Sequence, residues 1–190
     1  MPKENKNDLR VIRTKSGIKS AVKELIMELD ASKITVQRIT QKAMINRKTF
    51  YLHFSCIEAL FDDLFQELVS DYASFMDQYP LIHSFKDTNK VFFEFMAKQE
   101  PYMEKLVCSD SYQVYSNRFF EVMLKRNRSL YNPYQKYSRE EQNIINTFLG
   151  LSSVNIYRQW VKDGKKISIQ HLINLTGNLF TEGVNSLDLN

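Results

Sequence analysis

Side chains that bind nucleic acids crowd one short stretch of the sequence. Arg47, Lys48 and Thr49 are consecutive, and Tyr51 and His53 follow within four residues. Arg and Lys donate hydrogen bonds to guanine edges and phosphate oxygens, and Thr and Tyr hydroxyls hydrogen-bond phosphate oxygens. The cluster therefore indicates contact with a polyanion. Taken alone, Tyr51 and His53 are equally well explained as ordinary surface residues.

The residues around this cluster predict two short helices joined by a tight turn. Thr35 is a suitable N-cap for a helix over 36–42, and Asn46 is a suitable N-cap for a helix over 47–54. Helices this short are not stable alone, so both must pack on a longer neighbour. The pattern is that of a helix-turn-helix, whose second helix can enter the major groove of duplex DNA.

A longer helix that could support this pair precedes it in the sequence. Its apolar residues recur at the spacing of one helix face: Ile18, Ala21, Val22, Leu25, Ile26 and Leu29. Phe50 and Phe54, four residues apart, are expected to anchor the second short helix to it. We therefore predict a three-helix domain over residues 1–56, which we call the head.

The rest of the chain is predicted to be helical as well. Only 5 Gly and 4 Pro occur in 190 residues, which is too few for a turn-rich β fold. Helical patterns cover residues 57–76, 88–99, 101–108, 112–129, 139–162 and 168–187. The predicted fold is all-α, with the head followed by a helical-bundle domain for dimerisation and regulation over residues 57–190.

Positive charge is concentrated near the N-terminus. Residues 1–60 hold 12 Lys and Arg against 6 Asp and Glu, whereas residues 61–190 hold 14 against 16. A basic module on a mildly acidic body is typical of a protein that binds nucleic acid, because its cations displace the counterions condensed on phosphate. A solvated basic face on an ordinary domain would give the same distribution.

The stretch TVQRITQKAMINRKTFYLHFSCIEAL, residues 35–60, resembles the DNA-binding domain of the TetR/AcrR family. The motif is Thr49 to Phe54, followed by Glu58 and Leu60. The resemblance covers residues 9–65. The later helices are more loosely similar to a subgroup that includes activators of dihydroxyacetone kinase operons.

The resemblance implies a one-component transcriptional regulator that binds a pseudo-palindromic operator as a homodimer. Thr35, Tyr51 and His53 would contact phosphates, and the other members of the set would contact bases or nearby phosphates. The predicted DNA-binding residues are Thr35, Gln37, Arg38, Asn46, Arg47, Lys48, Thr49, Tyr51 and His53.

Two positions depart from the family pattern. Met44 stands in the turn where the family commonly has Gly, which adopts a left-handed backbone without strain. Ile57 stands where a Lys usually meets phosphate at the start of the fourth helix. These departures favour an alternative function, a protein-interaction co-regulator with a degenerate helix-turn-helix and weak DNA binding.

The last two long helices have more apolar residues than one neighbouring layer needs. The family resemblance implies that these helices pair with their copies in a second subunit. The predicted dimer interface is Ile145, Phe148, Leu149, Ser152, Ile156, Leu172, Leu175 and Leu179. A monomer that buries the same faces is the alternative.

Aromatic residues gather in the middle of the chain. Residues 72–137 contain 15 of the 23 Phe and Tyr residues. They predict a pocket for a small apolar or aromatic effector, although an aromatic core would explain the same composition. The candidate lining residues are Phe92, Phe95, Met96, Tyr102, Met103, Tyr115, Phe119 and Met123.

Other classes of function find little support in the sequence. Cys56 and Cys108 form neither a disulfide framework nor a metal motif, and the three His residues have no ligand spacing. No phosphate loop or nucleophile motif occurs. We therefore expect no metal, no cofactor and no enzymatic activity. Without an apolar run of membrane-spanning length or a signal sequence, we expect no membrane association and a cytoplasmic location.

Overall fold

The computed structural model describes the backbone of residues 6–79, 84–130 and 134–183. Within these ranges, the side chains of residues 6–8, 118, 119, 123, 124 and 126–130 lie outside the description. The α-helices are α1 (Lys6–Glu28), α2 (Val36–Lys42), α3 (Arg47–His53), α4 (Ile57–Met76), α5 (Phe85–Ala97), α6 (Pro101–Cys108), α7 (Gln113–Leu130), α8 (Arg139–Lys162) and α9 (Ile169–Glu182). Two 3-10 helices are η1 (Ala31–Lys33) and η2 (Asp110–Tyr112), and the described residues contain no strand. The predicted all-α fold is confirmed.

Side chains at the helix starts explain most of the boundaries. Thr35, Asn46, Ser138 and Ser168 each accept a hydrogen bond from a backbone N–H in the first turn. The first two are the N-caps that the sequence predicted. α5 begins three residues earlier than predicted because Ser84 and Asp87 form a capping box. In the described residues, no helix is both long and apolar enough to cross a membrane.

The chain folds into two compact units. The first unit comprises Met1–Leu68 and Glu100–Ser116, and the second comprises Val69–Gln99 and Asn117–Asn190. The predicted head, residues 1–56, falls wholly within the first unit. That unit also includes most of α4, all of α6 and η2, and the first residues of α7.

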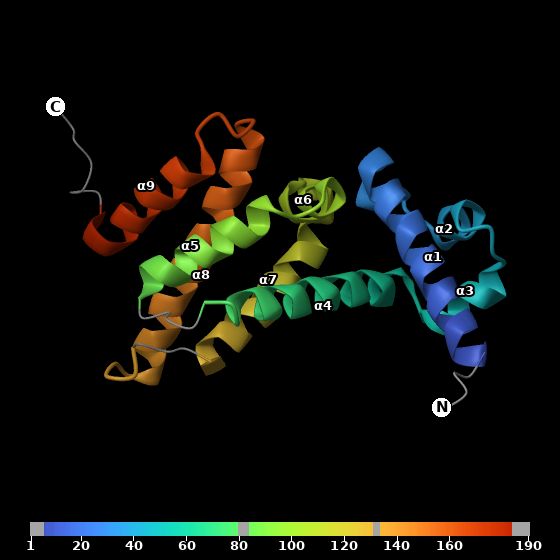
Figure 1. Cartoon of the computed structure of the whole chain (residues 1–190), viewed down its shortest axis with the longest axis horizontal. Helices are drawn as coiled ribbons and strands as arrows, with labels where there is room; N and C mark the ends of the chain where they lie inside the picture. Colours follow the sequence, from blue (N-terminus) through green and yellow to red (C-terminus); the bar gives the residue numbers. More distant parts are fainter. Residues whose placement is uncertain (1–5, 80–83, 131–133, 184–190) are drawn as a thin grey trace. The chain divides into compact units, whose positions relative to one another are not determined.

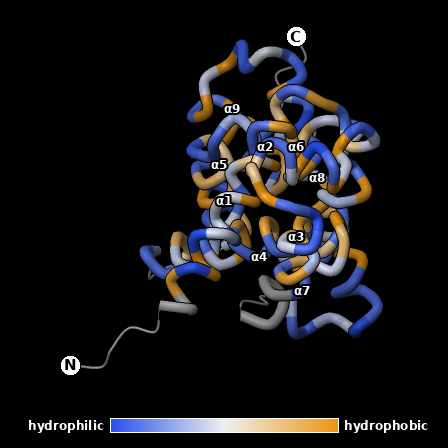
Figure 2. The backbone as a smooth tube through the Cα atoms, turned by 90° about the vertical axis from the view of Figure 1, so that its right-hand side faces the viewer, coloured by the Kyte–Doolittle hydropathy of each residue, from blue (hydrophilic) through white to orange (hydrophobic). Residues whose placement is uncertain are grey.

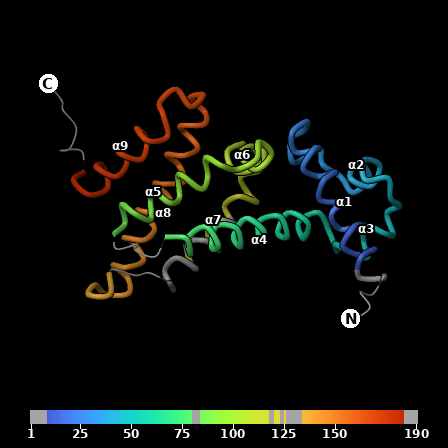
Figure 3. The backbone as a smooth tube through the Cα atoms, viewed as in Figure 1, coloured from blue at the N-terminus to red at the C-terminus, as the bar shows by residue number. Residues whose placement is uncertain are grey.

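In the first unit, the core lies between α1, the helix-turn-helix and α4. Figures 1 and 3 show α2 and α3 beside each other along α1. Hydrophobic and hydrophilic residues alternate along these helices, as expected for helices with one buried face (Figure 2). The buried apolar residues include Ile18, Val22, Ile26, Ile39, Phe50, Leu60, Phe61 and Leu64.

The second stretch of the first unit, Glu100–Ser116, holds the C-terminal end of α1. Lys105 Nζ donates to the carbonyl of Met27 at 3.0 Å, and the Tyr112 hydroxyl donates to the carbonyl of Leu29 at 2.8 Å. These carbonyls lie where an α-helix runs out of internal donors. The segment therefore supplies hydrogen bonds that α1 cannot make for itself.

In the second unit, α5, α8 and α9 share a core that contains polar as well as apolar side chains. α5 and α9 lie side by side (Figure 1). Asn89 of α5 donates to the Thr176 hydroxyl of α9 at 2.9 Å and accepts from the Ser153 hydroxyl of α8 at 2.9 Å. All three side chains are buried. We call them the polar triad.

Candidate nucleic-acid interface

The two short helices begin as predicted, at capped positions. The Thr35 hydroxyl accepts from the Arg38 backbone N–H at 3.2 Å, which fixes the first turn of α2. The Asn46 side-chain oxygen accepts from both the backbone N–H and the hydroxyl of Thr49, at 2.7 and 3.0 Å. Asn46 therefore acts as the N-cap of α3, and its amide oxygen already has two donors.

The turn between α2 and α3 has a left-handed residue at Met44, where the family commonly has Gly. Met44 adopts φ +52°, the left-handed region, and its side chain is 91% exposed. A residue with a Cβ costs about 1 kcal/mol in this conformation. The adjacent hydrogen bond from Ile45 N to Thr40 O, at 3.0 Å, closes the turn. The turn is therefore retained although glycine is absent.

Apolar residues on its buried side pack α3 against the rest of the head. Phe50 is fully buried and Phe54 nearly so, with ring centroids 5.9 Å apart. Ile39 of α2 is fully buried as well, and the Lys15 ammonium lies 5.4 Å from the Phe54 ring centroid. The predicted anchoring role of the two Phe residues is confirmed.

The opposite side of the helix-turn-helix is polar and open to solvent. Of the nine residues predicted to contact DNA, Thr49 and His53 are half-buried, and the following are exposed: Thr35, Gln37, Arg38, Asn46, Arg47, Lys48 and Tyr51. The Tyr51 ring is 55% exposed and packs edge-on against Phe50, with centroids 5.5 Å apart. The cationic side chains of α3 thus point away from the core.

Two arginines of this surface form hydrogen bonds within the protein. Arg47 donates from a terminal guanidinium nitrogen to the Gln37 side-chain oxygen at 3.1 Å. Arg38 donates to the carbonyl of Lys33 at 3.1 Å. Both arginines keep further N–H groups for other acceptors, because a guanidinium has five.

The sequence analysis missed an exposed apolar residue in this surface. Leu52 is 74% exposed on α3, one helical turn after Lys48. Apolar side chains can contact the methyl group of thymine in the major groove. The four-residue spacing from Lys48 was the signal that could have revealed it.

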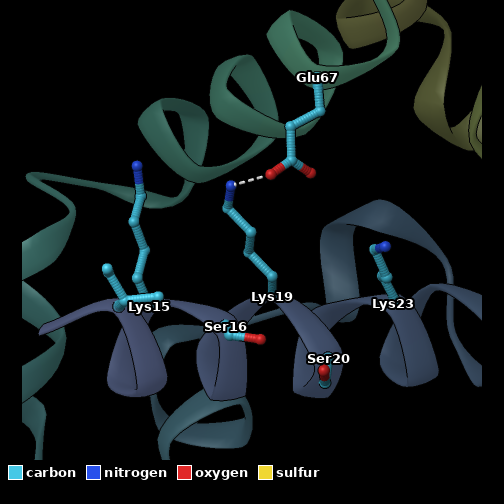
Figure 4. Close-up of a pocket in the computed structure, with 7 residues that line it drawn as sticks. Lys15, Ser16, Lys19, Ser20, Lys23 and Glu67 are labelled. Atoms are coloured by element: carbon cyan, nitrogen blue, oxygen red, sulfur yellow. Dashed lines mark hydrogen bonds and ion pairs between the residues drawn. The ribbon is translucent and has the colours of Figure 1, made fainter. Parts of the chain in front are cut away.

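Three lysines of α1 lie beside acidic side chains. A shallow groove of about 280 Å³ runs along α1 and is lined by Lys15, Lys19 and Lys23 (Figure 4). Lys15 pairs with Asp63 at 2.6 Å, and Lys19 pairs with both Asp63 and Glu67 of α4. These ion pairs link α1 to α4. Because the carboxylates offset much of the positive charge in the groove, the groove has little attraction for an anion.

The ion pairs also shift the pKa values of their members. Burial lowers the pKa of Lys19, but hydrogen bonds and charges from Asp63 and Glu67 outweigh it and raise the pKa above its usual value. Burial raises the pKa of Asp63, and Lys15 and Lys19 together bring it below its usual value. Each shift favours the charged form, as a formed ion pair requires.

The residues predicted for the dimer interface differ in exposure. Leu149 and Leu172 are buried within the second unit, and Phe148 is 60% exposed. The remaining five are partly exposed: Ile145, Ser152, Ile156, Leu175 and Leu179. Two further large apolar residues of α8, Ile144 and Leu151, are exposed, and the prediction did not include them.

The residues predicted to line an effector pocket are divided between the two units. Phe92, Phe95 and Met96 of α5 are buried in the second unit. Tyr102 and Met103 of α6 are buried in the first unit, where Tyr115 is stacked on Phe61 with centroids 4.3 Å apart. The side chains of Phe119 and Met123 lie outside the described residues. The pocket remains a prediction.

Comparison with known protein families gives a match over the C-terminal part of the chain. Residues 84–182 match TetR_C_8, a transcriptional regulator C-terminal region. The matched segment is more than half of the 190 residues. No curated protein sequence matches the chain.

Solved structures with a similar fold extend over nearly the whole chain. A TetR transcriptional regulator from Streptococcus agalactiae has a TM-score of 0.71 at 23% identity, over 92% of this chain and 97% of that one. NalD from Pseudomonas aeruginosa, the secondary repressor of the MexAB-OprM multidrug efflux pump, has a TM-score of 0.69 at 16% identity, with coverage of 92% and 96%. FadR from Bacillus subtilis in complex with stearoyl-CoA has a TM-score of 0.64 at 14% identity, over 88% of this chain and 98% of that one.

Proposed function

The chain belongs to the TetR family of transcriptional regulators, and we propose that it binds a pseudo-palindromic DNA operator as a homodimer through α2 and α3. The observation that supports this most directly is the division of α3 into two sides. Phe50 and Phe54 are buried, whereas Arg47, Lys48 and Tyr51 are exposed. The buried side of such a helix packs on the protein core, and the hydrogen-bond donors on its exposed side are free to contact DNA. We assign the chain no catalytic activity.

Dimerisation would supply the affinity that one helix-turn-helix lacks. A single recognition helix contacts only a few base pairs, and a two-fold dimer contacts two half-sites. α8 exposes Ile144 at 70% and Phe148 at 60%, and the Phe180 ring of α9 lies 6.0 Å from that of Phe148. Neighbouring apolar groups left in water favour a protein partner.

A small apolar or aromatic effector would regulate this binding. The aromatic residues of α5 and the bound stearoyl-CoA in the FadR structure support the proposal. An effector that binds preferentially to the DNA-free form must lower the affinity for the operator. Titration with acyl-CoA thioesters during operator binding tests it, and an unchanged operator affinity would leave this class without support.

The test of the DNA interface is the loss of operator binding in surface variants. Lys48→Ala and Tyr51→Ala should each weaken binding about tenfold, because each removes a donor from the protein–DNA contact. Lys166→Ala, which removes an exposed lysine of the second unit, should leave the affinity unchanged. Gel-shift titration and thermal unfolding of the three variants measure binding and folding separately. Wild-type affinity of both head variants would refute the assignment of α3.

A salt titration separates this function from the alternative, a protein-interaction co-regulator. Met44 in the turn and Ile57 at the start of α4 are the features that favour the alternative. A head that binds phosphates releases counterions, so its affinity for nonspecific duplex should fall steeply between 50 and 200 mM salt. A flat salt dependence would favour the co-regulator.

A further inference from the structure

One hydrogen bond links the two helices of the proposed DNA surface. The guanidinium of Arg47, at the start of α3, donates to the side-chain oxygen of Gln37, in the first turn of α2, at 3.1 Å. Both residues are exposed. The closed turn at Met44 and the buried Ile39 and Phe50 hold the two helices that carry this pair.

This bond restricts what Gln37 can do itself. A glutamine recognises adenine by accepting with its amide oxygen and donating with its amide nitrogen at the same time. One of the two lone pairs of the Gln37 oxygen accepts from Arg47, and this bond orients the amide group. Any contact of Gln37 with adenine must therefore fit the orientation that Arg47 imposes.

The bond leaves the chemistry of Arg47 intact. A guanidinium is planar and has five N–H donors, of which Gln37 engages one. Two of the others can donate together to O6 and N7 of guanine, the commonest base-specific contact in the major groove. Holding the side chain beforehand also reduces the rotamer freedom that it would lose on binding.

Asn46 shows the same use of an amide oxygen within the protein. Its oxygen accepts two hydrogen bonds from Thr49, so both of its lone pairs are used within the protein. The side-chain oxygens of Gln37 and Asn46 thus accept from within the protein, whereas Arg47 and Lys48 carry donors only. Donors match the two acceptors that guanine presents.

We propose that Gln37 is a positioning residue that orients Arg47, and that Arg47 recognises a guanine in each half-site. The proposal rests on the function proposed above. It differs from a direct base contact by Gln37, because the effect of Gln37 then depends entirely on the presence of Arg47.

The experiment is a double-mutant cycle on operator DNA. Wild-type protein first selects its site from a randomised duplex pool, and dissociation constants are then measured for that site and for versions with guanine replaced by adenine. Gln37→Met removes the acceptor at constant length and should lower the guanine preference about threefold to tenfold. Arg47→Met should abolish the preference, and the double variant should equal Arg47→Met.

Two variants separate positioning from simple disturbance of the surface. Gln37→Glu keeps an acceptor for Arg47, so the guanine preference should survive although the added negative charge weakens overall affinity. Gln41→Met changes an exposed glutamine one turn further along α2 and should leave the preference unchanged. Thermal unfolding verifies that every variant is folded.

Four results would overturn the proposal. Effects of Gln37→Met and Arg47→Met that multiply would show that Gln37 acts independently of Arg47. A selected site in which no guanine is sensitive to Arg47→Met would show that Arg47 does not recognise guanine. A loss of guanine preference in Gln41→Met equal to that in Gln37→Met would show that the effect is not specific to Gln37. In these three cases the proposed function stands, whereas selection of no DNA by the wild-type protein refutes the function and the inference together.

Discussion

The head and the second unit differ in the side chains that they bury and expose. In the head, Phe50 is buried, and Arg47 and Lys48 are exposed beside the apolar Leu52. In the second unit, Asn89 and its two partners are buried within a core of mainly apolar residues, while large apolar residues of α8 are exposed. The exposed face of α3 thus carries two cations, and the exposed face of α8 carries large apolar side chains.

This difference fits the two partners proposed above, duplex DNA and a second copy of the chain. An exposed row of donors is stable in water and gains from meeting phosphates and base edges. An exposed Phe148 is favoured only when another apolar surface covers it, because burial removes its area from water. The polar triad adds specificity inside the unit, since its hydrogen bonds form in only one register of α5, α8 and α9.

The largest expected effect is on the proposed dimer. Phe148→Ser should raise its dissociation constant about 100-fold, because an aromatic hot spot at an interface contributes about 3 kcal/mol. Sedimentation equilibrium over a range of protein concentrations measures it. A dissociation constant that stays at the wild-type value would show that Phe148 does not lie in a dimer interface.

A matched variant keeps this test specific. Val122→Ser removes another exposed apolar side chain of the second unit, on α7, and should leave dimerisation unchanged. Equal loss in both variants would indicate general disturbance of the second unit and no defined interface on α8.

The second effect is on folding and concerns the polar triad. Asn89→Ala removes two buried hydrogen bonds and leaves a small cavity, so the free energy of unfolding should fall by about 2 kcal/mol. Urea unfolding monitored by circular dichroism provides the measurement. Asn155→Ala, at an exposed site on α8, should change it by less than about 0.5 kcal/mol. An equal loss of unfolding free energy in the two variants would show that the hydrogen bonds of the polar triad contribute nothing specific to stability.

The smallest effect concerns the buried polar contact that the first unit does contain. Burial, with the charge of Asp30, raises the pKa of Tyr112 to about 12, and its hydroxyl donates to Leu29 O. Because the raised pKa favours the protonated form in the folded state, stability is kept below pH 10 and lost as pH rises towards 12. Tyr112→Phe should cost about 1 kcal/mol at neutral pH and make this alkaline loss shallower.

Unfolding curves at several pH values check that expectation. Tyr137→Phe, at an exposed tyrosine, should keep the wild-type slope between pH 10 and 12. An unchanged slope in Tyr112→Phe would show that other groups cause the alkaline loss.

Local chemistry made much of the fold predictable. Asn46 and Thr35 cap helices because their short side chains reach the first-turn N–H groups, a contact that depends only on neighbouring residues. Phe50 and Phe54 are four residues apart and so must share one face of α3. The family pattern placed the turn at Met44, where φ is +52°.

Long-range contacts could not be predicted in this way. Asn89, Ser153 and Thr176 lie far apart in the sequence, and nothing in their neighbours specifies that they meet. The bond between Gln37 and Arg47 depends on how two short helices pack, so the sequence suggested two separate base contacts. The predicted pocket residues were grouped by aromatic composition, which does not distinguish between two compact units.

The first unit is built from two stretches that are separated by thirty-one residues of the second. Tyr112 and Lys105 therefore reach α1 only after the chain has passed through α5. A gene fragment that encodes only the helix-turn-helix would leave those α1 carbonyls without their donors. A recombination event that moved the helix-turn-helix alone would therefore separate it from the segment that completes the first unit.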